Sequence, residues 1–207
     1  MLNLNQIHDF FQGCFEEHGE SAEGVGWNGA TAQELRFDQL LKVVRPEQPF
    51  TFIEFGCGYG HLLNYMRSKG MNPSHYAGVD ILESSLEAAR QQFKEDPAVS
   101  FHQSLAEVPE ADYLVASGVF NVKLDHENTT WTRYVIQSLH DFNQAARHGF
   151  AVNFLTQYSD FDRMAQRPDL YYADPCFLFD YCKINFSRNV ALLHDYDIYD
   201  FTLIVRK

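Results

Sequence analysis

The chain has 207 residues, of which 45% are hydrophobic, so its length and composition fit one domain with a sizeable core. Its formal net charge is −12, and the 16 lysines and arginines form no run. This charge argues against a nucleic-acid partner, because such binding depends on contacts between cations and phosphates.

The N-terminal residues lack the basic and then apolar layout of a signal peptide, and no apolar stretch is long enough to cross a bilayer. The four cysteines form no CxxC pair, and their spacing matches no zinc site or disulfide framework. We therefore expect reduced thiols, no bound metal, no membrane partner and a cytoplasmic location.

The first 45 residues are expected to form a helical cap ahead of a core at residues 46–207, within a single domain. A short helix and a loop are predicted in the first thirty residues. Thr31 and Glu34 have the spacing of a capping box, with Thr31 as the N-cap. The helix that they open is expected to end before Pro46.

From residue 51 onward, strand and helix patterns alternate along the chain. Strands are expected at 51–55, 76–80, 99–102, 113–116 and 150–155. A helix with Gly70 at its C-terminal end follows the first strand. Ser84 and Glu87 form a second capping box, which opens a helix to about Phe93. A long helix is expected to end at Gly149.

The end of the chain departs from this alternation. Asp174 and Pro175 provide an N-cap and a first helical residue, so a helix is expected to begin there. Strands at 190–193 and 201–205 are joined by a short acidic stretch, which fits an antiparallel hairpin.

This order of elements predicts an α/β fold. We expect a doubly wound, mainly parallel seven-stranded sheet with helices on both faces and a C-terminal antiparallel hairpin. An open sheet of this kind binds ligands at the carboxyl ends of its strands. Functional residues are therefore expected after Phe55, Asp80, His102 and Ala116.

The most informative stretch is the turn after the first strand. Gly56, Gly58 and Gly60 alternate there between a strand and a helix, and glycine allows a tight turn and a close approach of a ligand. Asp80 ends the second strand, where an acid can accept hydrogen bonds from both hydroxyls of a ribose. The alternative is a purely structural turn with Asp80 as an acid at a helix start.

The spacing of the turn is G-x-G-x-G, whereas the dinucleotide fingerprint is G-x-G-x-x-G. Glu54 lies two residues before the first glycine. This stretch resembles the first motif of the seven-stranded S-adenosylmethionine (SAM)-dependent methyltransferases. The resemblance covers residues 51–121, and the terminal hairpin agrees with it. The residues around Trp27, with Gln33-x-x-Arg36-Phe37, are similar to a group of small bacterial methyltransferases.

The resemblance implies that SAM is the cofactor and assigns contacts to it at four strand ends. Glu54 would orient the turn or the cofactor's amino group, Asp80 would hold the ribose, and Leu105 occupies the position of an adenine-binding Asp of many members. The full set of implied cofactor-binding residues is Glu54, Gly56, Cys57, Gly58, Gly60, Asp80, Ile81, Ser104, Leu105, Ser117 and Gly118.

Four further residues are hypotheses. Arg36, one helical turn after Gln33, could clamp the methionine carboxylate of SAM, or could pair with an acidic residue at the surface. Asn121, after the fourth strand, and Tyr171 or Tyr172, after the fifth, could position a methyl acceptor. The alternative for the tyrosines is that they cover a helix start.

The sequence thus predicts a SAM-dependent methyltransferase that acts on an oxygen or nitrogen atom of a small molecule. One alternative is an inactive SAM-binding regulatory subunit, since no catalytic base stands out. The other is an NAD(P)-binding oxidoreductase, whose sheet would end without the hairpin.

Overall fold

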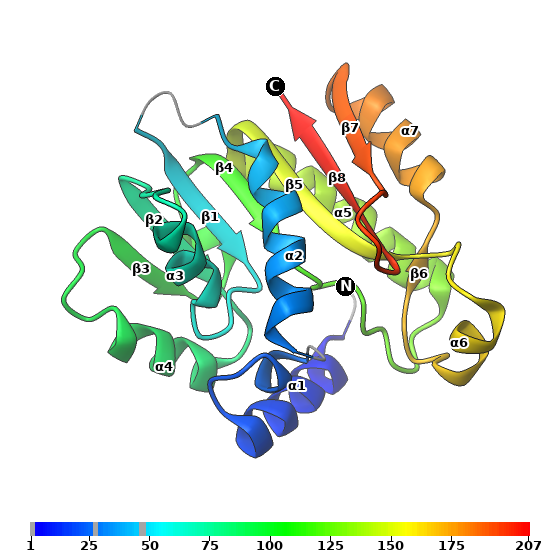
Figure 1. Cartoon of the computed structure of the whole chain (residues 1–207), viewed down its shortest axis with the longest axis horizontal. Coiled ribbons are helices and arrows are strands. Elements are labelled where there is room, and N and C mark those ends of the chain that lie inside the picture. The colour runs from blue at the N-terminus through cyan, green and yellow to red at the C-terminus, as the bar shows by residue number, and fades with distance from the viewer. Residues whose placement is uncertain (1–2, 27–28, 46–48) are drawn as a thin grey trace.

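The computed structural model of the chain describes residues 3–26, 29–45 and 49–207 (Figure 1). Within these ranges one sheet has the strand order β3-β2-β1-β4-β5-β8-β7, and β6 pairs with β5. The strands are β1 (Thr51–Phe55), β2 (His75–Val79), β3 (Val99–His102), β4 (Ala111–Ala116), β5 (Ala146–Thr156), β6 (Tyr172–Ala173), β7 (Asn189–Leu193) and β8 (Asp200–Arg206). Only β8 runs antiparallel, to both β5 and β7. The predicted parallel sheet and terminal hairpin are confirmed, and the two-residue β6 is an addition.

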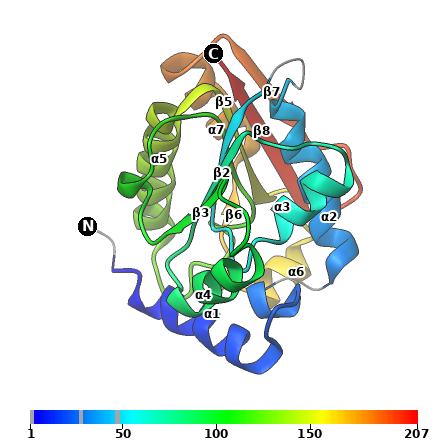
Figure 2. The same cartoon turned by 90° about the vertical axis from the view of Figure 1, so that its left-hand side faces the viewer.

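Helices cover both faces of this sheet. They are α1 (Asn5–His18), α2 (Ala30–Leu40), α3 (His61–Ser68), α4 (Glu83–Gln92), α5 (Asn128–Ala145), α6 (Phe161–Gln166) and α7 (Pro175–Asn185), with short 3₁₀ turns η1 (Glu23–Val25), η2 (Leu41–Val43) and η3 (Leu105–Glu107). Figure 2 views the sheet nearly edge-on, with α5 on one side and α2 and α3 on the other. In both views α1 lies across the end of the sheet, beside α4.

Alternating side chains of the strands build two cores. Ile53 of β1 and Leu114 of β4 belong to the core on the α5 and α7 side. Phe52 and Tyr76 belong to the core that contains Phe37 of α2. This alternation arises because successive side chains of a strand point to opposite faces. Glu54, two residues after Phe52, is therefore on the α2 side.

Helix starts did not all follow the sequence patterns. The two predicted capping boxes are wrong: α2 begins after Gly29 and α4 after Leu82, and neither has a side-chain cap. Asp174 is confirmed as the N-cap of α7, where its carboxylate accepts hydrogen bonds from the Cys176 and Phe177 N–H groups. Gly70 is also confirmed, since it has a φ of +75° just past the end of α3.

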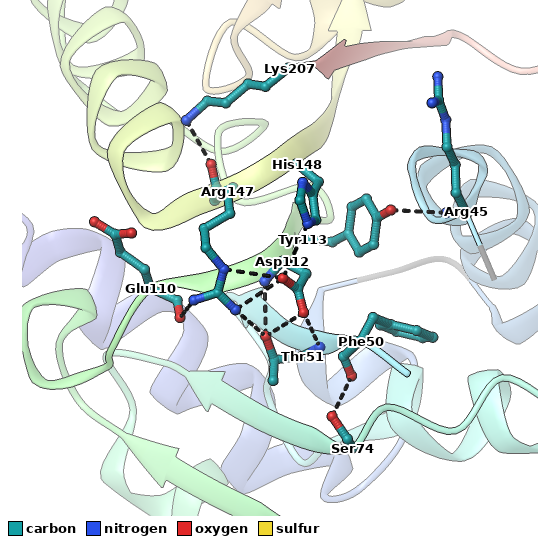
Figure 3. Close-up of polar contacts among 11 residues, drawn as sticks. Arg45, Phe50, Thr51, Ser74, Glu110, Asp112, Tyr113, Arg147, His148 and Lys207 are labelled. Atoms are coloured by element: carbon teal, nitrogen blue, oxygen red, sulfur yellow. Dashed lines mark hydrogen bonds and ion pairs between the residues drawn. The ribbon is translucent and has the colours of Figure 1, made fainter. Parts of the chain in front are cut away.

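A polar network joins the amino-terminal ends of three strands (Figure 3). The Arg147 guanidinium at β5 donates to Asp112 Oδ1 of β4 at 2.9 Å and to Thr51 Oγ1 of β1 at 3.1 Å. Asp112 Oδ2 also accepts from Thr51 N at 2.8 Å. Partial burial acts to raise the pKa of Asp112, but these hydrogen bonds outweigh it and the pKa is lowered. The network holds together the amino-terminal ends of β1, β4 and β5, at the end of the sheet opposite α1.

Two further features bear on the site. The predicted end of the long helix at Gly149 is wrong: α5 ends at Ala145 and β5 begins at Ala146, so no residue separates them. The predicted boundary between a cap at residues 1–45 and a core at 46–207 falls on residues 46–48, which lie outside the described ranges, and this division stays a prediction.

No helix in the described part of the chain is long and apolar enough to cross a membrane.

Candidate functional site

A cavity of about 340 Å³ lies where the parallel strands end, under α1. This size is within the range of small-molecule sites. Its walls come from the ends of β1, β2, β3 and β4, from α1 and η1, from the first turns of α2 and α3, and from α5. The position agrees with the carboxyl-end rule for open α/β sheets.

The glycine turn forms the floor of this cavity. Gly56 and Gly58 have φ values of +77° and +51°, a region that side chains disfavour. A Cβ atom on Gly56 would lie 2.2 Å from Val119 Cγ1, and one on Gly58 would lie 2.7 Å from Val25 Cγ1. Both glycines therefore serve close packing as well as the turn. Gly60 is the N-cap of α3 and shapes the turn without lining the cavity.

Asp80 connects the turn to the end of β2. Its Oδ2 accepts from Gly58 N at 2.8 Å and its Oδ1 accepts from Leu82 N at 2.9 Å. Burial raises the pKa of Asp80, and these backbone hydrogen bonds oppose the rise. The carboxylate also lines the cavity, so it can both hold the turn and face a ligand.

Glu54 is almost completely buried, with 2% of its surface exposed, yet it lines the same cavity. The Tyr76 hydroxyl donates a hydrogen bond to its Oε2. Burial raises the pKa of Glu54 to about 8, although the Tyr76 hydrogen bond acts to lower it. A cationic group of a ligand beside Glu54 would favour the ionised form.

The predicted adenine and methionine residues also reach the cavity. Lining side chains or backbone come from Cys57, Ile81, Ser104, Leu105, Ser117 and Gly118. The Ser117 hydroxyl is buried and has no hydrogen-bond partner among the described residues, and Ser104 Oγ accepts from Ala106 N at 3.3 Å. The structure thus brings together every residue of the predicted cofactor set except Gly60.

Arg36 does not line the cavity. Its guanidinium donates two hydrogen bonds to Asp200, from Nε to Oδ2 at 2.8 Å and from Nη2 to Oδ1 at 2.7 Å. Asp200 is only 1% exposed and also accepts from Asn153 Nδ2 at 2.8 Å, while Asn153 Oδ1 accepts from Gly118 N at 2.8 Å. Arg36 therefore pairs with an acid, as in the alternative to the carboxylate clamp, but the pair is buried and not at the surface. Arg36 anchors α2 to β8 and, through Asn153, to the loop after β4.

The three hypothetical acceptor-positioning residues are placed differently. Asn121 lines the cavity, and its Oδ1 accepts from Leu155 N at 3.1 Å. Tyr171 and Tyr172 do not line it. The Tyr171 hydroxyl bonds Thr132 Oγ1 at 2.8 Å, and its N–H donates to the Asn121 carbonyl at 2.9 Å. Tyr171 is therefore in a position to support Asn121, whereas Tyr172 does not line the cavity and makes no hydrogen bond with Asn121.

Several lining residues were missed by sequence reasoning. Leu4, Ile7 and Phe11 come from the start of the chain through α1, and Trp131, Tyr134, Ser138, Asp141 and Phe142 come from α5. Gln33 also lines the cavity, although it was noted only as a neighbour of Arg36. The signal for α5 was its apolar period, which indicates a buried face but not a ligand. Trp27 lies outside the described residues.

The arrangement fits SAM on observations of its own. The turn has no room for a side chain at Gly56 or Gly58, and Asp80 lines the cavity beside it. Buried polar atoms of Gln33 and Ser117 also lack hydrogen-bond partners among the described residues. No lysine or arginine is among the described lining residues, so Glu54 and Asp80 face no fixed cation there. In the same ranges, no group of three or more His, Cys, Asp or Glu is arranged to hold a metal ion.

Residues 53–149 match the family model described as a methyltransferase domain. Rv1506c of Mycobacterium tuberculosis, which is named as a methyltransferase, is 44% identical over 167 residues, covering 81% of this chain and 99% of that protein.

Solved structures with a similar fold include N-methyltransferase NodS from Bradyrhizobium japonicum in complex with S-adenosylhomocysteine. It has a TM-score of 0.64 and 12% identity, and the match covers 97% of each chain. DhpI, solved as a complex with SAM and HEP, has a TM-score of 0.60 and 10% identity over 99% of this chain and 95% of that one. At these identities the likeness concerns the fold.

Proposed function

Because the chain belongs to the SAM-dependent methyltransferases, we propose that it methylates an oxygen or nitrogen atom of a small-molecule acceptor. The observation that carries the proposal is the enclosure of the cavity between α1, η1 and α5. The cavity of about 340 Å³ is of small-molecule size, and its cover by α1 and η1 favours a small acceptor over a polymer segment.

The charges of the lining support a neutral or cationic acceptor. Glu54, Asp80 and Asp141 line the cavity, and no lysine or arginine is found among its described lining residues. Apart from the positive charges of the cofactor, a carboxylate or phosphate of an acceptor would meet these acids without a compensating cation. Amines and hydroxyl compounds are therefore favoured over anionic acceptors.

SAM, when bound, supplies an electrophilic methyl group on a positively charged sulfur. The chain's own task is then to bind and orient, and to exclude water. Asn121 is our candidate for contact with the acceptor, because Leu155 and Tyr171 fix its Oδ1 and its carbonyl while no described residue accepts from its Nδ2. Tyr171 would act through Asn121, and a role for Tyr172 has no support from its position.

A methyl-transfer assay with labelled SAM tests the proposal against matched panels of amines, hydroxyl compounds and carboxylates. We expect transfer to members of the first two panels and none to the third. Binding of SAM without transfer to any panel would favour the regulatory-subunit alternative. Tight binding of NAD instead of SAM would favour an oxidoreductase.

A cytoplasmic location stays part of the proposal. It rests on the cysteine spacing in the sequence, and Cys14, Cys57, Cys176 and Cys182 are free thiols in the structure. Alkylation in freshly lysed cells, which distinguishes reduced from oxidised cysteines, tests it, and we expect all four to be reduced.

A further inference from the structure

We infer that Gln33 binds the amino-acid end of SAM, with its side-chain Oε1 accepting a hydrogen bond from the cofactor's ammonium group. The inference rests on the methyltransferase function and adds a binding residue that the family resemblance did not assign.

The first support is an unpaired buried amide. Gln33 is 4% exposed and lines the cavity, and its Oε1 has no hydrogen-bond partner among the described residues. An amide oxygen buried without a donor is costly, and native proteins rarely retain one without a reason. Gln39, the other buried glutamine of α2, shows the usual arrangement, since its Oε1 accepts from Lys42 Nζ.

The second support is the position of Gln33 next to the glycine turn. Phe37, one helical turn after Gln33, lines the same cavity and lies 5.7 Å from the ring of His61, which directly follows Gly60. Glu34, the next residue in α2, approaches His61 Nε2 to 3.9 Å. The first turns of α2 therefore lie against the first turn of α3.

The third support is that Glu54 lies on the side of the sheet that is covered by α2, the helix of Gln33. Glu54 is on the side of the sheet that α2 and α3 cover, because its neighbours Phe52 and Tyr76 pack in the same core as Phe37. The ribose and adenine residues follow β2 and β3 instead. An amino-acid end drawn toward Glu54 would therefore lie between the glycine turn and Gln33.

The chemistry of the amide completes the argument. The ammonium of SAM has three donors, and Glu54 alone does not meet all of them. The Gln33 oxygen offers a second acceptor without adding a further buried negative charge. The ion pair of Arg36 with Asp200 holds α2 to β8, so the helix that carries Gln33 is in place before the ligand arrives.

Isothermal titration with three ligands tests the inference. S-adenosylhomocysteine has the whole amino-acid end, decarboxylated SAM keeps the ammonium but lacks the carboxylate, and methylthioadenosine lacks both. We expect Gln33→Leu, which keeps the side-chain size, to weaken the first two by about ten- to hundredfold. Its affinity for methylthioadenosine should stay within about threefold of the wild type.

Two further variants separate binding from folding. Gln33→Glu keeps an acceptor oxygen at the same distance along the side chain, so it should bind the first two ligands more tightly than Gln33→Leu does. Gln39→Leu, on the same helix but away from the cavity, should leave the affinity for each of the three ligands as in the wild type.

The contrary outcomes are distinct. Equal weakening of all three ligands by Gln33→Leu, or no weakening of any, would overturn the inference. Weakening of S-adenosylhomocysteine alone would also overturn it, because Gln33 would then meet the carboxylate. A wild-type protein that bound none of the three would contradict the cofactor assignment itself.

Discussion

At the scale of single residues, Asp80 joins the glycine turn to the cofactor. Its carboxylate already accepts from the Gly58 and Leu82 N–H groups, and a bound ribose would add donors on the cavity side. We expect Asp80→Ala to weaken SAM binding by about 1.5–3 kcal/mol for each charge-assisted hydrogen bond lost. Isothermal titration measures this change.

A matched control for Asp80 is Asp96→Ala, which removes a carboxylate that pairs with Arg67 away from the cavity. This variant should bind SAM as the wild type does. Unchanged affinity in Asp80→Ala, in a protein that remains folded by circular dichroism, would remove the ribose assignment.

Glu54 should make stability depend on pH in an unusual direction. Its pKa is about 8 in the folded protein, against 4.5 ordinarily, so between these values the folded chain binds more protons than the unfolded chain. The free energy of unfolding attributable to Glu54 therefore falls as the pH rises from about 4.5 to about 8, and changes little above that.

Glu54→Gln removes this titration while keeping an oxygen that can accept from Tyr76. We expect the stability of the variant relative to wild type to increase with pH, by about 3–4 kcal/mol from pH 5 to pH 8, in urea unfolding at each pH. The gain should come with weaker SAM binding, because the variant lacks a charge to meet the ammonium. A constant difference between the two proteins across this pH range would show that Glu54 is ionised when folded.

At the scale of elements, the buried ion pair between Arg36 and Asp200 determines where α2 sits. Arg36→Ala would leave the Asp200 carboxylate buried without its main cationic partner. We expect the free energy of unfolding to fall by about 3–5 kcal/mol, as for other buried pairs that lose one member. Urea denaturation measures this loss.

Arg147→Ala provides the comparison, because the Arg147 guanidinium is about half exposed in its pair with Asp112 (Figure 3). Solvent screens that pair, so its loss should cost about 1 kcal/mol. Equal losses in the two variants would contradict the view that burial makes Arg36 the stronger anchor.

The segment that covers the cavity should respond to the cofactor. Gly24, Val25 and Gly26 line the cavity, and Val25 packs against Gly58. We expect hydrogen exchange across residues 15–26 to slow when SAM is added, because a ligand held beneath the segment opposes its local opening. Exchange in α7, which does not line the cavity, should not change. Equal exchange with and without SAM would make the segment an ordinary surface loop.

Features built from neighbouring stretches of the chain could be predicted from the sequence, and contacts between distant elements could not. The glycine turn and Asp80 were predictable because strand, turn, helix and acid are consecutive in the chain. The capping boxes were wrong because Gly29 and Leu82 precede the helices instead, and the Asp80 carboxylate already bonds the Leu82 N–H. The partners Arg36 and Asp200 are 164 residues apart, so no local pattern could pair them. The ligand-facing role of Gln33 likewise depends on how α2 docks.

At the scale of the whole molecule, the net charge of −12 limits the choice of partner. We expect fluorescence anisotropy to show no salt-sensitive binding to transfer RNA or duplex DNA, because the chain lacks the cations that release counterions from phosphates. Binding of a fluorescent SAM analogue in the same buffer serves as the positive control. Submicromolar binding to either nucleic acid at physiological salt would overturn the small-molecule proposal.

The direct junction of α5 and β5 constrains how this enzyme could diverge. The start of β5 already takes up one extra residue against β4, since Ala111 pairs with Ala146 and Tyr113 with Gly149, and no loop residue precedes it. A further insertion or deletion within α5 would turn its cavity-facing side chains away from their positions. The wall that Tyr134, Ser138 and Asp141 contribute to the cavity therefore changes by side-chain exchange at fixed positions. Insertions are easier to accommodate after β5, in the stretch from Gln157 to Leu170 that includes α6, at the opposite end of that strand. Lineages that acquire new acceptors should carry point substitutions along α5 and length variation after β5.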